Sequence, residues 1–187
     1  MNILTLLFGE PSRSRSRTTI DTDTDIVRAI ILRRPDLTQL DVLRTVYLVQ
    51  VMHVGRHAER ILPDWFEATL LGPYNIDLAR MCRSRLVRRR RDAARLPGPT
   101  LSPRVLTIVE ELCASLGDAP GARLHKLTSM DGGAWYRLWE PDPRSLLPMS
   151  DPRSRTRHGR PSDRGPVIGF SHMIDDYRVI TQPVGTA

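Results

Sequence analysis

The two side chains best placed to bind a metal ion are His53 and His57. They stand four positions apart, and on a helix this spacing brings both imidazoles to one face, within reach of one zinc ion. The pattern ends there, because Glu59 does not complete a His-Glu-x-x-His motif and no third ligand is indicated. We therefore interpret both histidines as half-exposed helix residues and predict no metal.

Two further groups of residues partly match known binding loops. Asp21, Asp23 and Asp25 alternate with threonine as at the start of a calcium loop, but the glycine and the distal glutamate of that loop are missing. Acidity at the start of a helix explains these aspartates better. The Asp-Gly-Gly stretch at 131–133 lacks the lysine and hydroxyl residues of a phosphate loop and predicts a turn.

No residue has the sequence neighbours of an enzymatic nucleophile. No serine lies in a Gly-x-Ser-x-Gly segment, and neither Cys82 nor Cys113 has an active-site signature or CxxC spacing. Both cysteines are expected to be reduced thiols that pack in the core. The sequence therefore predicts a protein that is not an enzyme and that uses no cofactor.

Arginine supplies almost all of the positive charge of the chain. The formal net charge is +7 over 187 residues, and Lys126 is the only lysine. The arginines are concentrated at 13–17, 83–95 and 153–164, where they could contact phosphates. Aromatic residues that would stack on bases are not interleaved with them, and no helix-turn-helix spacing is convincing. Nucleic acid is therefore a less favoured partner than protein.

Apolar spacing predicts a mainly α fold, a compact domain of about six helices with a short strand or hairpin near residues 64–71. The clearest helix starts after Thr38, which can cap it, and has Asp41 at its third position. Apolar residues over 40–54 form a broad surface, typical of a central helix packed on more than one side, and the helix should end at or just after Gly55. The β-leaning stretch at 65–71 stops at Gly72-Pro73.

Further helices are predicted on either side of this centre. They cover residues 25–34, 76 to the arginines at 88–91, 103–116, 122–127, 134–140 and about 170–180. Ser102-Pro103 marks one start, Gly117 its end, and Ser171 is the expected cap of the last helix. Residues 1–24 are expected to form a flexible Arg/Ser arm, 141–166 a Pro/Arg-rich loop and 181–187 a tail.

Every apolar run in the sequence is short. Residues 3–8 form the only apolar run near the N-terminus, which is too short for the core of a signal peptide and has no basic residue before it. No later run reaches the roughly 20 apolar residues that span a bilayer. We expect a cytoplasmic protein with no membrane partner.

Several segments resemble, in order, the motifs of one protein family. Residues 40–50 look like its opening helix, in which leucines are followed by a tyrosine and a glutamine. Residues 66–73 resemble its Phe-Glu-Ala-x-x-x-Gly-Pro turn, residues 124–135 its Leu-Thr-His segment with a later tryptophan, and residues 165–177 its last loop and helix. Residues 25–180 thus resemble the Panacea family, the domain of SocA-like antitoxins and phage-associated GepA-like proteins. The matched positions include Leu43, Tyr47, Phe66, Glu67, Ala68, Gly72, Pro73, Thr128 and Trp135.

Three positions depart from the family pattern. Thr69 replaces a common tryptophan, Tyr74 stands where valine is usual after Gly-Pro, and Ser129 replaces the expected histidine. The insertion at 141–166 is also longer than usual. Core packing explains the matched apolar positions, and turn geometry explains Gly72-Pro73, so the resemblance identifies a scaffold without locating its binding surface.

The resemblance implies a prokaryotic antitoxin of a toxin–antitoxin system, which neutralises a cognate toxin by direct protein–protein binding. The aromatic candidates for partner contact are Trp65, Tyr74 and Trp139, and core packing is the alternative for each. Two other functions stay open, a proteolytic adaptor that delivers a toxin to a protease and a DNA-binding autorepressor.

Overall fold

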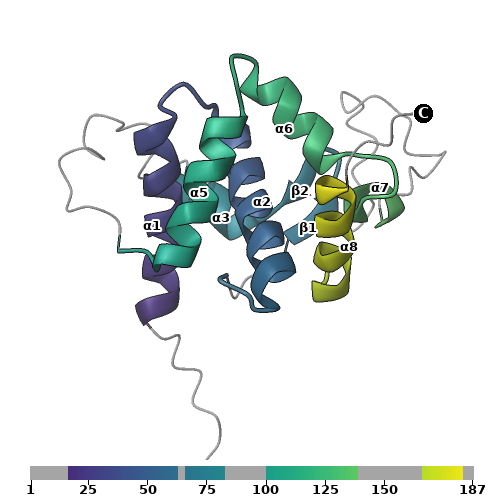
Figure 1. Cartoon of the computed structure of the whole chain (residues 1–187), viewed down its shortest axis with the longest axis horizontal. Helices are drawn as coiled ribbons and strands as arrows, with labels where there is room; N and C mark the ends of the chain where they lie inside the picture. The colour runs from purple at the N-terminus through teal and green to yellow at the C-terminus, as the bar shows by residue number, and fades with distance from the viewer. Residues whose placement is uncertain (1–16, 63–65, 83–99, 139–165, 183–187) are drawn as a thin grey trace, which may run out of the picture.

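Seven helices and three short strands make up the part of the chain that the computed structural model describes, residues 17–62, 66–82, 100–138 and 166–182 (Figure 1). The mainly α fold is confirmed, with seven helices in these ranges where about six were expected. The helices are α1 (Arg17–Arg33), α2 (Gln39–His57), α3 (Ile76–Met81), α5 (Pro103–Ser115), α6 (Pro120–Thr128), α7 (Ala134–Leu138) and α8 (Phe170–Thr181). The strands are β1 (Phe66–Thr69), β2 (Gly72–Tyr74) and β3 (Val167–Ile168).

Several sequence predictions fall outside the described residues. They are residues 1–16 of the predicted arm, the arginines at 83–95, the predicted loop at 141–166 except its last residue, and the tail beyond residue 182. In the four described ranges, no helix combines the length and the apolar character needed to cross a membrane.

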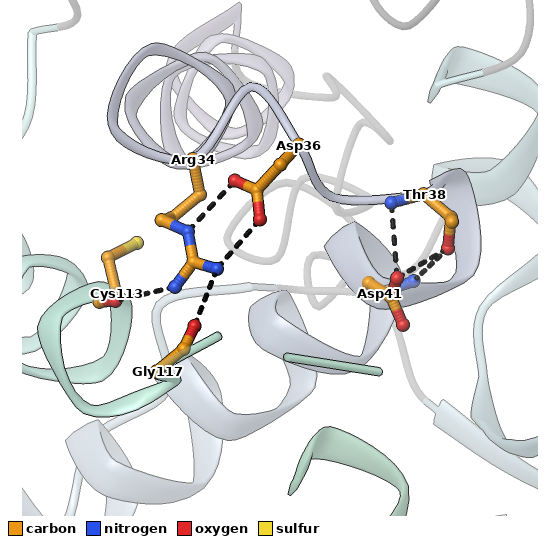
Figure 2. Close-up of polar contacts among 6 residues, drawn as sticks. All are labelled: Arg34, Asp36, Thr38, Asp41, Cys113 and Gly117. Carbon is orange, nitrogen blue, oxygen red and sulfur yellow. Dashed lines mark hydrogen bonds and ion pairs between the residues drawn. The ribbon is translucent and has the colours of Figure 1, made fainter. Parts of the chain in front are cut away.

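Helix α2 lies at the centre of the fold. The side chain of Thr38 accepts a hydrogen bond from the amide of Asp41 at 3.2 Å, and the carboxylate of Asp41 accepts one from the amide of Thr38 at 3.1 Å (Figure 2). This reciprocal cap satisfies two amides at the start of the helix. Every residue from 41 to 54 is buried, because α1, α5, α6, α8 and the hairpin strands all contact α2. The prediction of a central helix packed on several sides is confirmed.

Helices α1 and α5 pack side by side next to α2 and are joined through Arg34 (Figure 2). The guanidinium of Arg34 contacts the carboxylate of Asp36 at 2.9 and 2.7 Å, and it donates to the carbonyls of Cys113 and Gly117 at 3.3 and 3.0 Å. A planar guanidinium can satisfy all of these acceptors at once. Gly117 has a φ of +61°, as expected for the glycine that follows a helix.

Helix α8 packs against α2 at Gly55. As predicted, α2 ends just after this glycine, at His57, and Ala58 then adopts the left-handed conformation with φ 52°. A Cβ on Gly55 would overlap the ring of Tyr177 in α8. Glycine at this position therefore lets the two helices approach closely.

The predicted arm at 1–24 is wrong for residues 17–24, because α1 begins at Arg17. The three aspartates lie beyond the first turn of α1, which contains no acidic residue, so the expected helix-start acidity does not explain them. Tertiary contacts hold this part of the helix, since Thr24 donates to the sulfur of Met81 at 3.2 Å and Asp25 accepts from the amide of Thr100 at 3.1 Å.

The sheet has the order β2-β1-β3 and is antiparallel throughout. The predicted strand at 64–71 is the β1–β2 hairpin, and Gly72 begins β2 with a φ of +100°, a conformation that favours glycine. Strand β3 was not predicted. Ile168 of β3 pairs with Phe66, and both side chains are buried against α2 and its neighbours.

The predicted cap of the last helix, Ser171, is wrong. Gly169, and not Ser171, is the residue before α8, and its amide donates to Nδ1 of His172 at 3.0 Å. The short strand β3 places Gly169 at the point where the chain leaves the sheet, so the helix starts directly after it.

Candidate functional site

The residues that resemble the family motif lie on elements that meet at the β1–β2 hairpin. Tyr47 of α2 contacts Phe66 of β1 edge to face, with ring centroids 5.0 Å apart and planes inclined at 68°. Leu43 and Ala68 are buried in the same core, and Trp135 packs against it. These contacts join the hairpin to α2 and α7 in one core.

A buried carboxylate joins α2, α7 and α8 beneath the hairpin. The hydroxyl of Tyr47 donates to Asp176 of α8, and the other carboxylate oxygen accepts from the amide of Ala134, the first residue of α7. Burial raises the pKa of Asp176, and the two hydrogen bonds oppose that rise. Burial also raises the pKa of Tyr47, and the neighbouring carboxylate adds to this rise.

Sequence reasoning missed Asp176. One signal could have found it, because Asp176 lies three residues after Met173 and four before Ile180, on the face of α8 that packs against the core. A carboxylate on the apolar face of a helix needs an internal donor.

The tip of the hairpin presents two leucines to solvent. Leu70 and Leu71 are 59% and 48% exposed. The turn beneath them is held by Thr69, whose hydroxyl accepts from the amide of Leu71 at 3.2 Å and donates to the carbonyl of Gly72 at 3.0 Å. The indole of Trp135 donates to the carbonyl of Thr69 at 2.6 Å and ties the turn to α7. The tip is thus apolar, exposed and fixed.

Arg44 of α2 holds the other side of the same turn. Its Nη2 donates to the carbonyl of Leu71 at 3.1 Å and lies 3.3 Å from Nδ1 of His125 in α6. The residue is only 9% exposed, and its Nε is buried without an acceptor. Burial lowers the pKa of Arg44, while the charge of Asp41 opposes this effect.

Arg44 carries its charge without an acidic partner. None of the ion pairs among the described residues includes it. A guanidinium removed from water is normally paired with a carboxylate or fully hydrogen-bonded, because an uncompensated buried charge is costly. The hairpin site therefore contains one strong donor group whose bonding capacity is only partly used.

His125 lies at the exposed side of Arg44. Its Nδ1 faces both Nη2 of Arg44 and the hydroxyl of Ser129, which is 3.4 Å away. Since an arginine can only donate, a hydrogen bond between Arg44 and His125 needs a lone pair on Nδ1, which places the ring proton on Nε2.

Of the three aromatic residues predicted to contact a partner, only Tyr74 lies in the described ranges. It is half-buried in β2, opposite Glu67 of β1, and packs against the core. Trp65 and Trp139 lie outside the described residues. Pro73 is buried opposite Ala68, as expected for a residue that shapes the turn.

The remaining motif residues hold the same region together. Thr128 of α6 is buried and donates to the carbonyl of Leu124 at 2.8 Å. A Cβ on Gly72 would lie 3.9 Å from the Thr128 hydroxyl, so α6 and the hairpin turn are close neighbours. Gln50 accepts from the amides of Ile61 and Leu62 at 3.1 and 3.2 Å and fixes the chain after α2.

His53 is less accessible than predicted, whereas His57 is half-exposed as predicted. The rings of His53 and His57 lie 4.7 Å apart, but His53 is buried, with 6% exposed, and was wrongly expected to be half-exposed. The chain after α2 folds back over it, and its Nδ1 lies 2.9 Å from the carbonyl of Glu59. In the described part of the chain, no group of three or more metal-binding side chains is present.

The prediction of two buried thiols is confirmed. Cys82 and Cys113 are both free and buried. Burial raises the pKa of Cys82 to about 12 and that of Cys113 to about 11. Thiols with such high pKa values contain very little of the reactive thiolate at neutral pH.

Comparison with protein-family models, with curated proteins and with solved structures finds no match. The fold and the site nevertheless define a class of protein. It is a mainly helical domain, built round one buried helix, that presents the apolar tip of a β-hairpin held by Arg44 and Trp135.

Proposed function

We propose that this chain is an antitoxin that neutralises a cognate toxin by direct protein–protein contact, and that the hairpin tip forms part of the contact surface. The observation that carries the proposal is the exposure of Leu70 and Leu71 on a turn that is held from two sides. Exposed apolar side chains grouped at a fixed position are typical of interaction sites.

The chemistry of the turn supports this function. Hairpin turns favour glycine, asparagine, aspartate and serine for reasons of backbone geometry, whereas this tip has two adjacent leucines. Burial of the two leucines in a complex would contribute a favourable hydrophobic free energy, because both side chains stay exposed in the free chain. Because Thr69, Trp135 and Arg44 already hold the turn, little conformational entropy would be lost on binding.

The resemblance to the Panacea family supports the identity of the partner. Within the family motif Phe-Glu-Ala-x-x-x-Gly-Pro, the positions of Leu70 and Leu71 at the turn are unspecified, whereas a tryptophan is common at the position of Thr69. A motif that specifies the strands and leaves the tip variable suits a scaffold whose members bind different partners. We infer that the tip contributes to the choice of toxin.

Co-expression with the toxic product of a neighbouring open reading frame tests the proposal. Wild-type chain should restore growth, and the double variant Leu70→Glu, Leu71→Glu should lose rescue, because two charges would be buried against the toxin. The matched control is Leu32→Glu on α1, a leucine with 41% of its surface exposed, which should rescue fully. Circular dichroism of each purified variant verifies folding. Rescue that survives both tip substitutions would contradict a role for the hairpin.

Toxin lifetime in the same cells separates sequestration from the alternative of delivery to a protease. A toxin that persists but is inactive supports sequestration, and a toxin whose half-life falls when the chain is present supports an adaptor. Binding to the promoter of its own gene, weakening steeply with salt, would instead support the autorepressor.

A further inference from the structure

We propose that Arg44 receives the carboxylate of an aspartate or glutamate side chain of the partner protein, next to the hairpin leucines. The identity of that partner rests on the proposed function, but the carboxylate site belongs to this chain and can be tested without the toxin.

The first argument is the unused bonding capacity of Arg44. A guanidinium has five N–H donors. In Arg44 only Nη2 has acceptors, the carbonyl of Leu71 and the ring of His125, and the buried Nε has none. A carboxylate that takes the place of the Leu71 carbonyl on Nη2 would fill this deficit, because its two oxygens match the parallel N–H bonds of Nε and Nη2.

Arg34 shows what a satisfied arginine looks like in the same protein (Figure 2). It pairs with Asp36 through two contacts of 2.9 and 2.7 Å and donates to two carbonyls. Its hydrogen bond with Asp36 raises the pKa of Arg34, whereas burial lowers the pKa of Arg44. Arg34 thus has a carboxylate within hydrogen-bonding distance, whereas Arg44 is in no ion pair of the described residues and is affected only by the charge of Asp41.

The second argument concerns the surroundings of the site. Arg44 binds the carbonyl of Leu71, so a ligand of this arginine lies beside the two exposed leucines of the tip. A protein segment with an acidic and an apolar side chain close together can bind both Arg44 and the exposed leucines, whereas free phosphate can bind only Arg44. The net charge of +7 also favours an acidic partner.

The turn itself covers Nε. A Cβ on Gly72 would lie 3.8 Å from Nε of Arg44. A carboxylate that reaches this edge therefore has to replace the Leu71 carbonyl on Nη2, and the amides of residues 70–72 should report its binding.

A nuclear magnetic resonance titration of the full chain tests the inference. The probe is 4-methylpentanoate, which joins a carboxylate to a leucine-like branched chain. Its neutral amide, 4-methylpentanamide, and inorganic phosphate are the comparison ligands. We expect the carboxylate to shift the amide signals of residues 70–72 and 125–129, and both comparison ligands to cause shifts at least about tenfold weaker at equal concentration, since one bidentate pair contributes roughly that factor.

Two arginine variants provide the controls. Arg44→Met should abolish the response and change the melting temperature of the free chain by less than about 4 °C, because the loss of the hydrogen bond to the Leu71 carbonyl opposes the gain from removing a buried charge. Arg34→Met should keep the response and lower the melting temperature, because it removes the contacts with Asp36 and two carbonyls. Should Arg44→Met fail to fold, Arg44→Lys keeps the charge without the planar fork and should weaken the response several-fold.

Three results would overturn the inference. They are the absence of shifts at residues 70–72 in the wild-type chain, a response that persists without the Arg44 guanidinium, and an equal response to phosphate, which would assign a general anion site. Failed toxin rescue together with a normal carboxylate response would remove the antitoxin proposal and leave the Arg44 site standing.

Discussion

Replacing Tyr47 by phenylalanine tests whether the Asp176 network holds α7 and α8 to the central helix. The substitution removes only the hydroxyl and keeps the ring contact with Phe66 at 5.0 Å. Asp176 loses one of its two donors and keeps the amide of Ala134. A hydrogen bond to a charged group contributes about 1.5–3 kcal/mol. We therefore expect the free energy of unfolding to fall by about 2 kcal/mol near neutral pH.

The dependence of this loss on pH provides a second check. Burial raises the pKa of Asp176 above its ordinary value of 3.8. The carboxyl therefore contributes stability that is fully present below the unfolded pKa and is lost as the pH rises through the folded pKa. In Tyr47→Phe the ionised carboxylate of Asp176 keeps only one donor, the amide of Ala134. The pKa of Asp176 in the folded variant should therefore rise further. The deficit relative to wild type should then shrink on acidification.

Urea denaturation followed by far-ultraviolet circular dichroism, at about pH 7 and about pH 4.5, measures both effects. The matched control is Tyr136→Phe in α7, a tyrosine with 54% of its surface exposed, for which we expect a change within about 0.5 kcal/mol. A loss below about 0.5 kcal/mol for Tyr47→Phe near pH 7, or an equal loss at both pH values, would refute the reasoning.

Two other substitutions test the central helix. Gly55→Ala should destabilise the fold by about 1–3 kcal/mol, because the added methyl group overlaps the ring of Tyr177. The loss should be smaller in the Tyr177→Ala background, as measured by thermal melts of the wild type, the two single variants and the double variant. An equal loss in both backgrounds would contradict a role for the overlap. Thr38→Ala removes the side chain that accepts from the amide of Asp41 and should cost about 1 kcal/mol, measured by urea denaturation with Thr107→Ala, at an exposed position of α5, as the control.

The helix boundaries that were predicted best depend on local signals. Thr38 and Asp41 cap α2, and Ser102 with Pro103 starts α5, as the residue types indicated. The hairpin followed from the Gly-Pro step after a β-leaning stretch. Each of these features is encoded within a few neighbouring residues and could therefore be predicted from the chain alone.

The features that were missed depend on contacts between distant segments. Strand β3 has two residues, too few to show an alternating pattern, and it exists because β1 offers it a partner. The start of α1 was placed too late because Thr24 and Asp25 are held by residues far along the chain. In the same way, no spacing rule could indicate that Arg44 would be buried without an acid.

Helix α7 has only five residues, far fewer than an isolated helix needs to persist in water. Its first amide is bonded to Asp176 and its second residue, Trp135, is bonded to the hairpin turn. Its helical state is therefore conditional on two neighbours at once. Any event that pulls the tip away from Trp135 would leave α7 attached mainly to α8, through Asp176 and the contact of Arg137 with Asp175, and would favour its unwinding.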